Sequence, residues 1–253
     1  MHLLSAVVIT KNEEKNIALC IEALQQVADE IIIVDSFSTD RTAEICAGYK
    51  VRFYQQEWLG FGPQKNFGIA KASYNIILSS DADEILGAGA IKAINALKVS
   101  GFEGVYALRL VQFYFGKFIR YGIEAPNYRN RIFDKTKVHW NENDVHEKLV
   151  IPQGTRITRI QEDVAHYSYH SIEQFIAKSN LYTTLGAQLL YRNNKHSYLF
   201  KLICSPAFTF IKGYFIKGGF REGMHGLILA KLNAQTTFLK YAKLRQLCIY
   251  GVQ

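Results

Sequence analysis

Short apolar runs that end in polar residues recur along the first hundred positions of the chain. The runs occupy residues 3–9, 30–34, 51–55 and 74–80, and their length and β-branched content predict buried strands. Segments with the spacing of amphipathic helices follow them, at residues 16–26, 41–47, 66–72 and 87–98. Residues 60–66 contain two glycines and a proline and are expected to form a loop. This alternation predicts an α/β fold around a mostly parallel sheet flanked by helices.

The fourth apolar run ends abruptly in the acidic residues Asp81, Asp83 and Glu84. Open α/β sheets bind their ligands at the carboxyl ends of the strands, so the cluster predicts carboxylates in a ligand crevice. Asp81 and Asp83 are two positions apart, and in an extended segment they point the same way and repel each other unless a cation neutralises them. Hard oxygen ligands suit Mg²⁺ or Mn²⁺, whose remaining positions are filled by substrate phosphates and water. The alternative is a polar cap on helix 87–98.

Polar residues also follow the first two strands, so three strand ends carry candidate nucleotide-binding groups. The candidates at the first strand end are Thr10, Asn12, Glu13 and Glu14, and residues 35–40 follow the second strand. A dinucleotide-binding fold would need a Gly-x-Gly-x-x-Gly turn after the first strand, where this chain has Thr-Lys-Asn-Glu-Glu. The phosphate-binding loop of nucleotide hydrolases is missing from the sequence as well.

The second half of the chain has a different pattern. Residues 104–115 and 131–134 predict antiparallel strands, with an irregular loop at 118–129 between them. Residues 172–192 have helical periodicity, and Ser171 is a plausible cap for that helix. Residues 197–219 interleave apolar and aromatic positions with lysines, which fits a helix in a membrane interface, a contact with a partner subunit, or core packing.

The net charge and the cysteine spacing of the chain indicate which ligands and which cellular compartment suit it. The chain has 253 residues with a formal net charge of +8, which favours nucleotide phosphates, nucleic acid or an acidic membrane surface. Its four cysteines have no paired spacing, which argues against a zinc knuckle or a disulfide framework and fits a reducing cytoplasm. No secretory leader is expected at the N-terminus, and no stretch reaches the roughly eighteen uncharged apolar residues that span a bilayer.

The motifs at the strand ends resemble family 2 glycosyltransferases of the A-type fold, specifically the enzymes that add a sugar to the lipopolysaccharide core. The resemblance lies in the order and spacing of Val8-Ile9-Thr10-Lys11-Asn12-Glu13-Glu14, Ile33-Val34-Asp35-Ser36-Phe37-Ser38-Thr39-Asp40-Arg41-Thr42, Gln64-Lys65-Asn66 and Asp81-Ala82-Asp83-Glu84. It implies that Asp35 reads the uracil or ribose of a UDP-sugar and that Lys65 lies near the nucleotide. It also implies that Asp81 meets the ribose or the metal, and that Asp83 coordinates the metal.

Two further roles come from the same resemblance. Val145-His146-Glu147 resembles the acceptor-side motif of these transferases. An inverting transfer needs a carboxylate that takes the proton from the acceptor hydroxyl, and we expect Glu147 to be that base, with Asp144 in reserve. By its position after this segment, His166 is the candidate that completes the metal or diphosphate site. The glycine-rich residues 218–223 and residues 226–229 resemble the C-terminal region of the core-lipopolysaccharide enzymes.

The sequence therefore predicts a transferase domain at residues 1–170 and a helical extension at 171–253. Residues 1–100 would bind the nucleotide sugar and residues 101–170 the acceptor. We expect a cytoplasmic, inverting, metal-dependent enzyme that moves a hexose, foremost glucose from UDP-glucose, onto a lipopolysaccharide core sugar or related glycolipid. An anionic membrane surface is a further expected partner and nucleic acid is not. The alternatives are a transferase for another polysaccharide or a protein glycan, and a non-catalytic nucleotide- or glycan-binding module.

Overall fold

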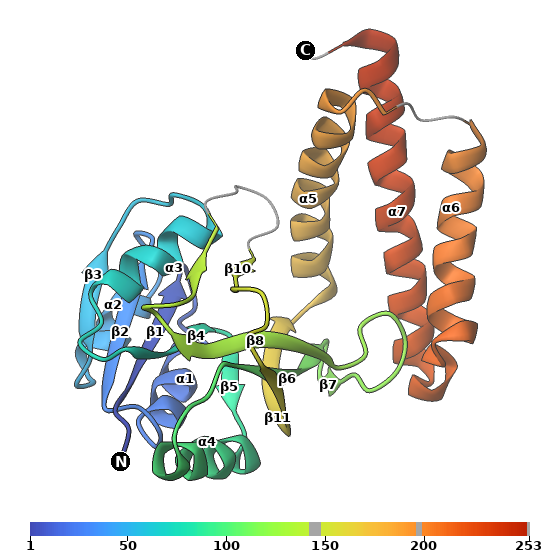
Figure 1. Ribbon diagram of the computed structural model, residues 1–253. Helices are drawn as coiled ribbons and strands as arrows, with labels where there is room; N and C mark the ends of the chain where they lie inside the picture. Colours follow the sequence, from blue (N-terminus) through green and yellow to red (C-terminus); the bar gives the residue numbers. More distant parts are fainter. Residues whose placement is uncertain (142–147, 196–198, 252–253) are drawn as a thin grey trace. The chain divides into compact units, whose positions relative to one another are not determined.

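The computed structural model describes residues 1–141, 148–195 and 199–251 of the chain (Figure 1). Contacts divide the chain into two compact units. Unit 1 comprises residues 1–111 and 127–167, and unit 2 comprises residues 112–126 and 168–253. Residues 112–126, expected in the acceptor half, group by their contacts with the C-terminal helices.

Unit 1 is built on a mixed sheet whose strand order is β3-β2-β1-β4-β8-β6-β11-β5. The strands β3, β2, β1 and β4 are parallel, as expected from the repeated strand and helix pattern, and β8 pairs antiparallel with both β4 and β6. Two short strands, β9 and β10, form a separate antiparallel pair. The strand bounds are β1 Leu4–Thr10, β2 Glu30–Asp35, β3 Arg52–Gln55, β4 Ile76–Asp81, β5 Glu84–Leu86, β6 Val105–Tyr114, β7 Lys117–Phe118, β8 Asn127–Asp134, β9 His139–Trp140, β10 Leu149–Val150 and β11 Ile157–Tyr169.

Helices cover both faces of the parallel strands, because successive side chains of a strand point to opposite faces. Val8 and Ile33 belong to the core cluster that includes residues of α1 and α4, whereas Val7 and Val34 belong to the cluster that includes Ile69 of α3. The expected α/β architecture with a helical C-terminal extension is confirmed. The helices of unit 1 are α1 Ile17–Leu24, α2 Thr42–Ala47, α3 Phe61–Ala70 and α4 Ala88–Ser100.

The start of α3 differs from the sequence prediction. Residues 60–66 were expected to be a loop, but α3 begins at Phe61 and includes Pro63 in its first turn. Proline is tolerated there because the first N–H groups of a helix have no partner within the helix. A Cβ atom on Gly62 would lie 1.9 Å from the carbonyl oxygen of Asn141, so this glycine permits a close backbone approach rather than breaking the helix.

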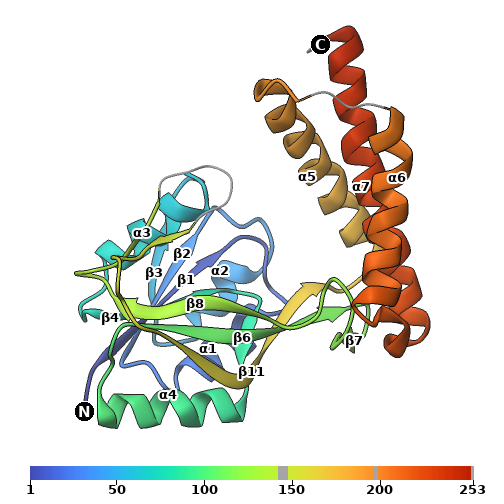
Figure 2. The same ribbon diagram turned by 45° about the vertical axis from the view of Figure 1, so that its right-hand side comes forward.

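Unit 2 contains the helices α5 Ile172–Arg192, α6 Leu199–Ile211 and α7 Met224–Tyr250. The helix α7 packs against both α5 and α6 (Figures 1 and 2). The bounds predicted for α5 are confirmed, and so is its cap, since the Ser171 side chain accepts a hydrogen bond from the backbone N–H of Gln174. The helix α6 continues as a π-helical segment, Lys212–Ile216, and a short 3₁₀ helix, Gly219–Glu222, leads into α7.

One helical stretch in this region, Leu199–Ile216, is long and apolar enough to cross a bilayer by length and composition alone. It is not the uncharged run that the sequence was expected to lack, because Lys201 and Lys212 lie within it. Two of its 18 residues are lysines, which is few enough for a span of this kind. Core packing, one of the three readings left open for this segment, is not observed, because none of the α6 residues is buried.

A buried carboxylate joins the turn before α7 to the loop that follows β7. Oε1 of Glu222 accepts hydrogen bonds from the backbone N–H groups of Arg120 and Tyr121, at 2.7 and 2.9 Å. Oε2 of Glu222 lies 2.7 Å from Nζ of Lys117. Although burial by itself raises the pKa of Glu222, these partners lower it below its usual range. The loop is thereby fixed against the start of α7.

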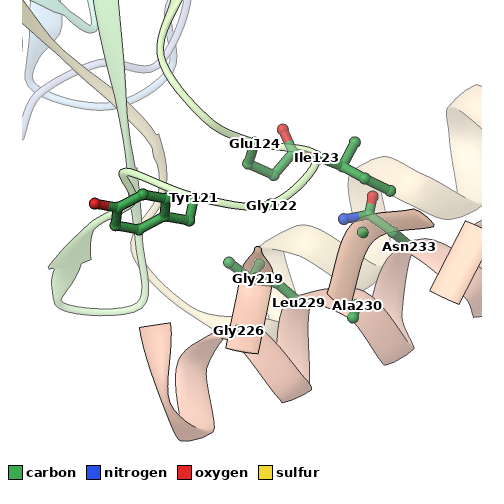
Figure 3. Close-up of a pocket in the computed structure, with 10 residues that line it drawn as sticks. Tyr121, Gly122, Ile123, Glu124, Gly219, Gly226, Leu229, Ala230 and Asn233 are labelled. Carbon is green, nitrogen blue, oxygen red and sulfur yellow. The ribbon is translucent and has the colours of Figure 1, made fainter. Parts of the chain in front are cut away.

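The same junction is tightly packed around Gly226, which lies beside Gly219 and the loop through Gly122 (Figure 3). A Cβ atom on Gly226 would lie 1.8 Å from the carbonyl oxygen of Gly219. We therefore expect Gly226→Ala to lower the free energy of unfolding by about 1–3 kcal/mol, measured by urea denaturation followed by circular dichroism. Gly186→Ala in α5 is the matched control, because its Cβ would meet only the flexible Lys240 side chain at 3.4 Å. The control should stabilise by about 0.5–1 kcal/mol, and an equal loss in both variants would contradict the packing argument.

Candidate active site at the carboxyl ends of β1, β2 and β4

The three polar strand ends lie side by side in unit 1. In the strand register Thr10 of β1 is opposite Asp35 of β2, and Ile9 of β1 is opposite Asp81 of β4. The strands are parallel, so their carboxyl ends share one edge of the sheet. The sequence expectation that these segments meet at one edge is therefore met by the structure.

The segments after β1 and β2 are hydrogen-bonded to each other. Oδ1 of Asn12 accepts from the backbone N–H of Thr39 at 2.8 Å, and the backbone N–H of Glu13 donates to Oγ1 of Thr42 at 2.8 Å. Oε2 of Glu14 accepts from the backbone N–H of Arg41 at 3.2 Å. Asn12 and Glu14 thus use their side chains to hold two loops together as one wall of the site, and a direct role for Asn12, Glu13 and Glu14 in binding substrate stays a prediction.

Asp35 is completely buried at the end of β2. Its carboxylate accepts hydrogen bonds from the backbone N–H and the hydroxyl of Ser38, which shape the turn into α2. The next residue, Ser36, accepts a hydrogen bond from Nε2 of Gln64 at 3.0 Å, which links the turn to α3. Asp35 therefore organises the loop at the edge of the sheet, and its proposed contact with uracil or ribose stays a prediction.

Asp81 lies between two protein cations. Oδ1 of Asp81 is 3.1 Å from Nζ of Lys65, and Oδ2 is 3.0 Å from a guanidinium nitrogen of Arg131. Although burial by itself raises the pKa of Asp81, the charges of Lys65 and Arg131 hold it well below its usual range. The same Arg131 guanidinium also binds the buried carboxylate of Glu84. The sequence reasoning assigned the neutralising charge to a metal, whereas for Asp81 the structure supplies it from α3 and β8.

This arrangement predicts a large stability effect at Arg131. Replacing Arg131 with Met leaves the buried Glu84 carboxylate without its guanidinium, and we expect the free energy of unfolding to fall by about 3–5 kcal/mol in urea denaturation. The double variant Arg131→Met/Glu84→Gln removes both charges and should recover most of the loss. A double variant no more stable than the single one would show that Arg131 does not act through Glu84.

Asp83 and His166 form a second pair at this edge. Oδ2 of Asp83 lies 3.2 Å from Nε2 of His166, and both side chains are partly exposed. Backbone pairing fixes the two residues, since the N–H of Tyr167 donates to the carbonyl of Asp83 and His166 is opposite Glu84 in the register of β11 and β5. Burial by itself lowers the pKa of His166, but the hydrogen bond and negative charge of Asp83 raise it above its usual value.

The Asp83 and His166 pair fits a divalent cation that takes few protein ligands. A cation held by Asp83 and His166 would replace the hydrogen bond that now joins them, because a metal-bound imidazole nitrogen carries no proton. Among the described residues no group of three or more His, Cys, Asp or Glu side chains could hold a metal. A cation here would therefore complete its shell with oxygens of a substrate and with water.

Asn141 and Lys148 border the segment that is expected to contain the base, residues 142–147. Glu147 and Asp144, together with His146, lie outside the described residues, so their placement is not part of this structure. The residues on either side are hydrogen-bonded to each other, with Asn141 N–H donating to the Lys148 carbonyl at 2.9 Å and Lys148 N–H donating to Asn141 Oδ1 at 3.0 Å.

Asn66 of α3 exchanges two hydrogen bonds with the backbone of Trp140, just before this segment, and the Nζ atom of Lys65 lies 4.5 Å from the centre of the Trp140 ring. Trp140 is thus tied to the helix α3, which holds Lys65 against Asp81. The sequence assigns no role to Arg131 or Asn66, and it does not show that Glu84, a member of the predicted acidic cluster, is buried against Arg131. A buried carboxylate such as that of Glu84 requires a basic partner, but the local sequence does not show which Lys or Arg that partner is.

Comparison with known proteins agrees with this geometry. The family model described as glycosyl transferase family 2 matches residues 5–158. A lipopolysaccharide core biosynthesis glycosyltransferase, LpsC of Rhizobium meliloti, is 32% identical over 96% of this chain and 92% of its own length. An uncharacterized glycosyltransferase of Rickettsia bellii is 30% identical over 97% of this chain and 87% of its own length.

Among solved structures, S. aureus TarS 1–349 in complex with UDP has a TM-score of 0.49 and 16% identity over 99% of this chain and 92% of that chain. The matched region, residues 5–158, contains the strand ends that carry Thr10, Asp35 and Asp81. The chain belongs to glycosyl transferase family 2 and is a glycosyltransferase with the A-type fold.

Proposed function

We propose that this glycosyltransferase is inverting and metal-dependent, and that it moves a hexose from a UDP-sugar, foremost UDP-glucose, onto a sugar of the lipopolysaccharide core. The observation that carries the proposal is the pair formed by Asp83 and His166, on the same edge of the sheet as the ends of β1, β2 and β4. The name of the Rhizobium meliloti relative supports the acceptor class.

The residues at the strand ends would bind the donor. Asp83 and His166 would hold Mg²⁺ or Mn²⁺, which offsets negative charge on the diphosphate leaving group when bound. Thr10 and Asp35 border the place for the nucleoside at the ends of β1 and β2. Lys65 and Arg131 hold the carboxylate of Asp81 at the end of β4, and a contact of Asp81 with the ribose or the metal would form beside these two ion pairs.

Glu147 would take the proton from the acceptor hydroxyl as that oxygen attacks the anomeric carbon of the donor sugar. The bond between the sugar and the diphosphate breaks on the opposite side, so a single displacement inverts the configuration. Asp144 is the second candidate for the base.

Isothermal titration calorimetry of UDP tests the donor part of the proposal. We expect saturable binding of UDP in Mn²⁺ that is strongly weakened by EDTA, and weaker binding of ADP and GDP, because a hard dication bridges protein ligands and phosphate oxygens. Equal binding of all three nucleotides, or binding of UDP unaffected by EDTA, would contradict it.

A further inference from the structure

Positive charge is concentrated in unit 2. This unit contains 13 of the 30 Lys and Arg residues but only 3 of the 22 Asp and Glu residues, a net charge of +10. Unit 1 contains the other 17 basic and 19 acidic residues, a net charge of −2. The basic excess of the chain therefore belongs to the helical unit and not to the part that carries the donor site.

The helix α6 and the π-helical segment that continues it expose a broad apolar face. Phe200, Ile203, Phe208, Ile211 and Phe215 have exposed fractions between 47% and 75%. Their spacing places them on one half of the helix surface. Large exposed apolar patches of this kind are rare on monomeric soluble proteins and mark a binding surface.

The opposite side of α6 packs against α7, and Figure 2 shows the two helices running alongside each other. Oγ1 of Thr209 lies 3.2 Å from Oγ1 of Thr237 at this contact. The helix α7 carries Lys231, Lys240 and Lys243, and it is not among the described helices apolar enough to cross a membrane. Because the charged helix α7 packs against α6, we expect α6 to lie in the plane of a membrane interface and not across the bilayer.

The seam between α6 and α7 opens into an apolar groove of about 510 Å³. Pro206, Ala207 and Phe210 line it from α6, and Ala234 lines it from α7. Lys231 is the charged residue of the lining. An apolar groove with one cation suits the acyl chain and the phosphate of a lipid.

We propose that unit 2 docks on an anionic lipid bilayer, with the exposed face of α6 inserted among the headgroups and Lys201, Lys212 and Lys217 close to lipid phosphates. The exposed apolar face and the positive charge of unit 2 both support a lipid bilayer as the occupant of this surface. Interfacial helices bind membranes through burial of apolar side chains and through attraction to anionic lipids. The proposal uses none of the donor-site residues, so it stands or falls independently of the proposed donor and acceptor.

Cosedimentation of the full chain with lipid vesicles tests the proposal. We expect binding to vesicles that contain phosphatidylglycerol, weaker binding at high salt, and little binding to phosphatidylcholine alone. Lys201→Gln/Lys212→Gln/Lys217→Gln should lower the affinity about a hundred-fold. Phe200→Ser/Ile203→Ser/Phe208→Ser should remove binding. Val99→Ser is the matched control, since Val99 is equally exposed but lies in unit 1.

Circular dichroism and thermal unfolding of each variant establish that it is folded. Equal cosedimentation of the parent and both triple variants would overturn the proposal. Absence of lipid binding by the parent would also overturn it. If light scattering then showed a parent dimer that the α6 variant converts to a monomer, the occupant of this face would be a second copy of the chain.

Discussion

Replacing Glu147 with Gln is expected to lower sugar transfer by about a hundred- to ten-thousand-fold, the usual effect of removing a general base. The amide has nearly the same volume as the carboxylate but cannot accept the proton of the acceptor hydroxyl. The affinity for UDP-sugar should stay at the parental value, because the base acts on the acceptor. Transfer is measured by product formation and donor affinity by calorimetry, so a stability loss is distinguished from a loss of chemistry.

Asp144→Asn is the control for that prediction. It lies three residues before Glu147, and its substitution is equally conservative. Near-parental transfer by Glu147→Gln together with an inactive Asp144→Asn would identify Asp144 as the base. Activity in both variants would mean that neither Glu147 nor Asp144 is the base.

Asp83→Ala is expected to abolish the Mn²⁺ dependence of UDP-sugar binding. The variant removes one of the two side chains that lie within 3.2 Å of each other at the candidate metal site, so the diphosphate loses its compensating charge. Calorimetric titration of UDP in Mn²⁺ and in EDTA measures the effect. The parent should show a large difference between the two conditions, and the variant should show none.

His166→Ala is the companion variant, because it removes the other member of the pair without changing the acidic cluster. The difference between its UDP affinity in Mn²⁺ and in EDTA should also be smaller than that of the parent. A folded Asp83→Ala protein that binds UDP with parental affinity and parental Mn²⁺ dependence would exclude Asp83 as a ligand.

The parallel half of unit 1 could be predicted from the sequence because each of its signals is local. An apolar run, a polar strand end and a helical stripe follow one another within a few residues, and β1 to β4 lie within a few residues of the predicted runs. The helix α5 was predicted with its bounds because Ser171 caps it and its apolar spacing is regular. The meeting of Thr10, Asp35 and Asp81 then follows from the geometry of parallel strands.

The parts that could not be predicted depend on residues far apart in the chain. Arg131 pairs with Glu84 across 47 positions, and no local pattern shows that an arginine in β8 reaches a carboxylate in β5. The start of α3 was missed because glycine and proline usually mark loops, whereas Gly62 makes room for the backbone of Asn141. The interleaved lysines of Leu199–Ile216 left three readings open in the sequence, and the choice among them depends on which side chains the distant helix α7 covers.

Release of UDP from a panel of UDP-sugars, measured in Mn²⁺ and in EDTA and with and without a lipopolysaccharide core acceptor, tests the central claim most directly. The account predicts that one UDP-hexose, foremost UDP-glucose, is turned over in Mn²⁺, that EDTA stops the reaction, and that the acceptor accelerates it. Saturable binding of UDP without turnover of any UDP-sugar, with the acceptor present, would contradict the account and indicate a nucleotide-binding module on the same fold.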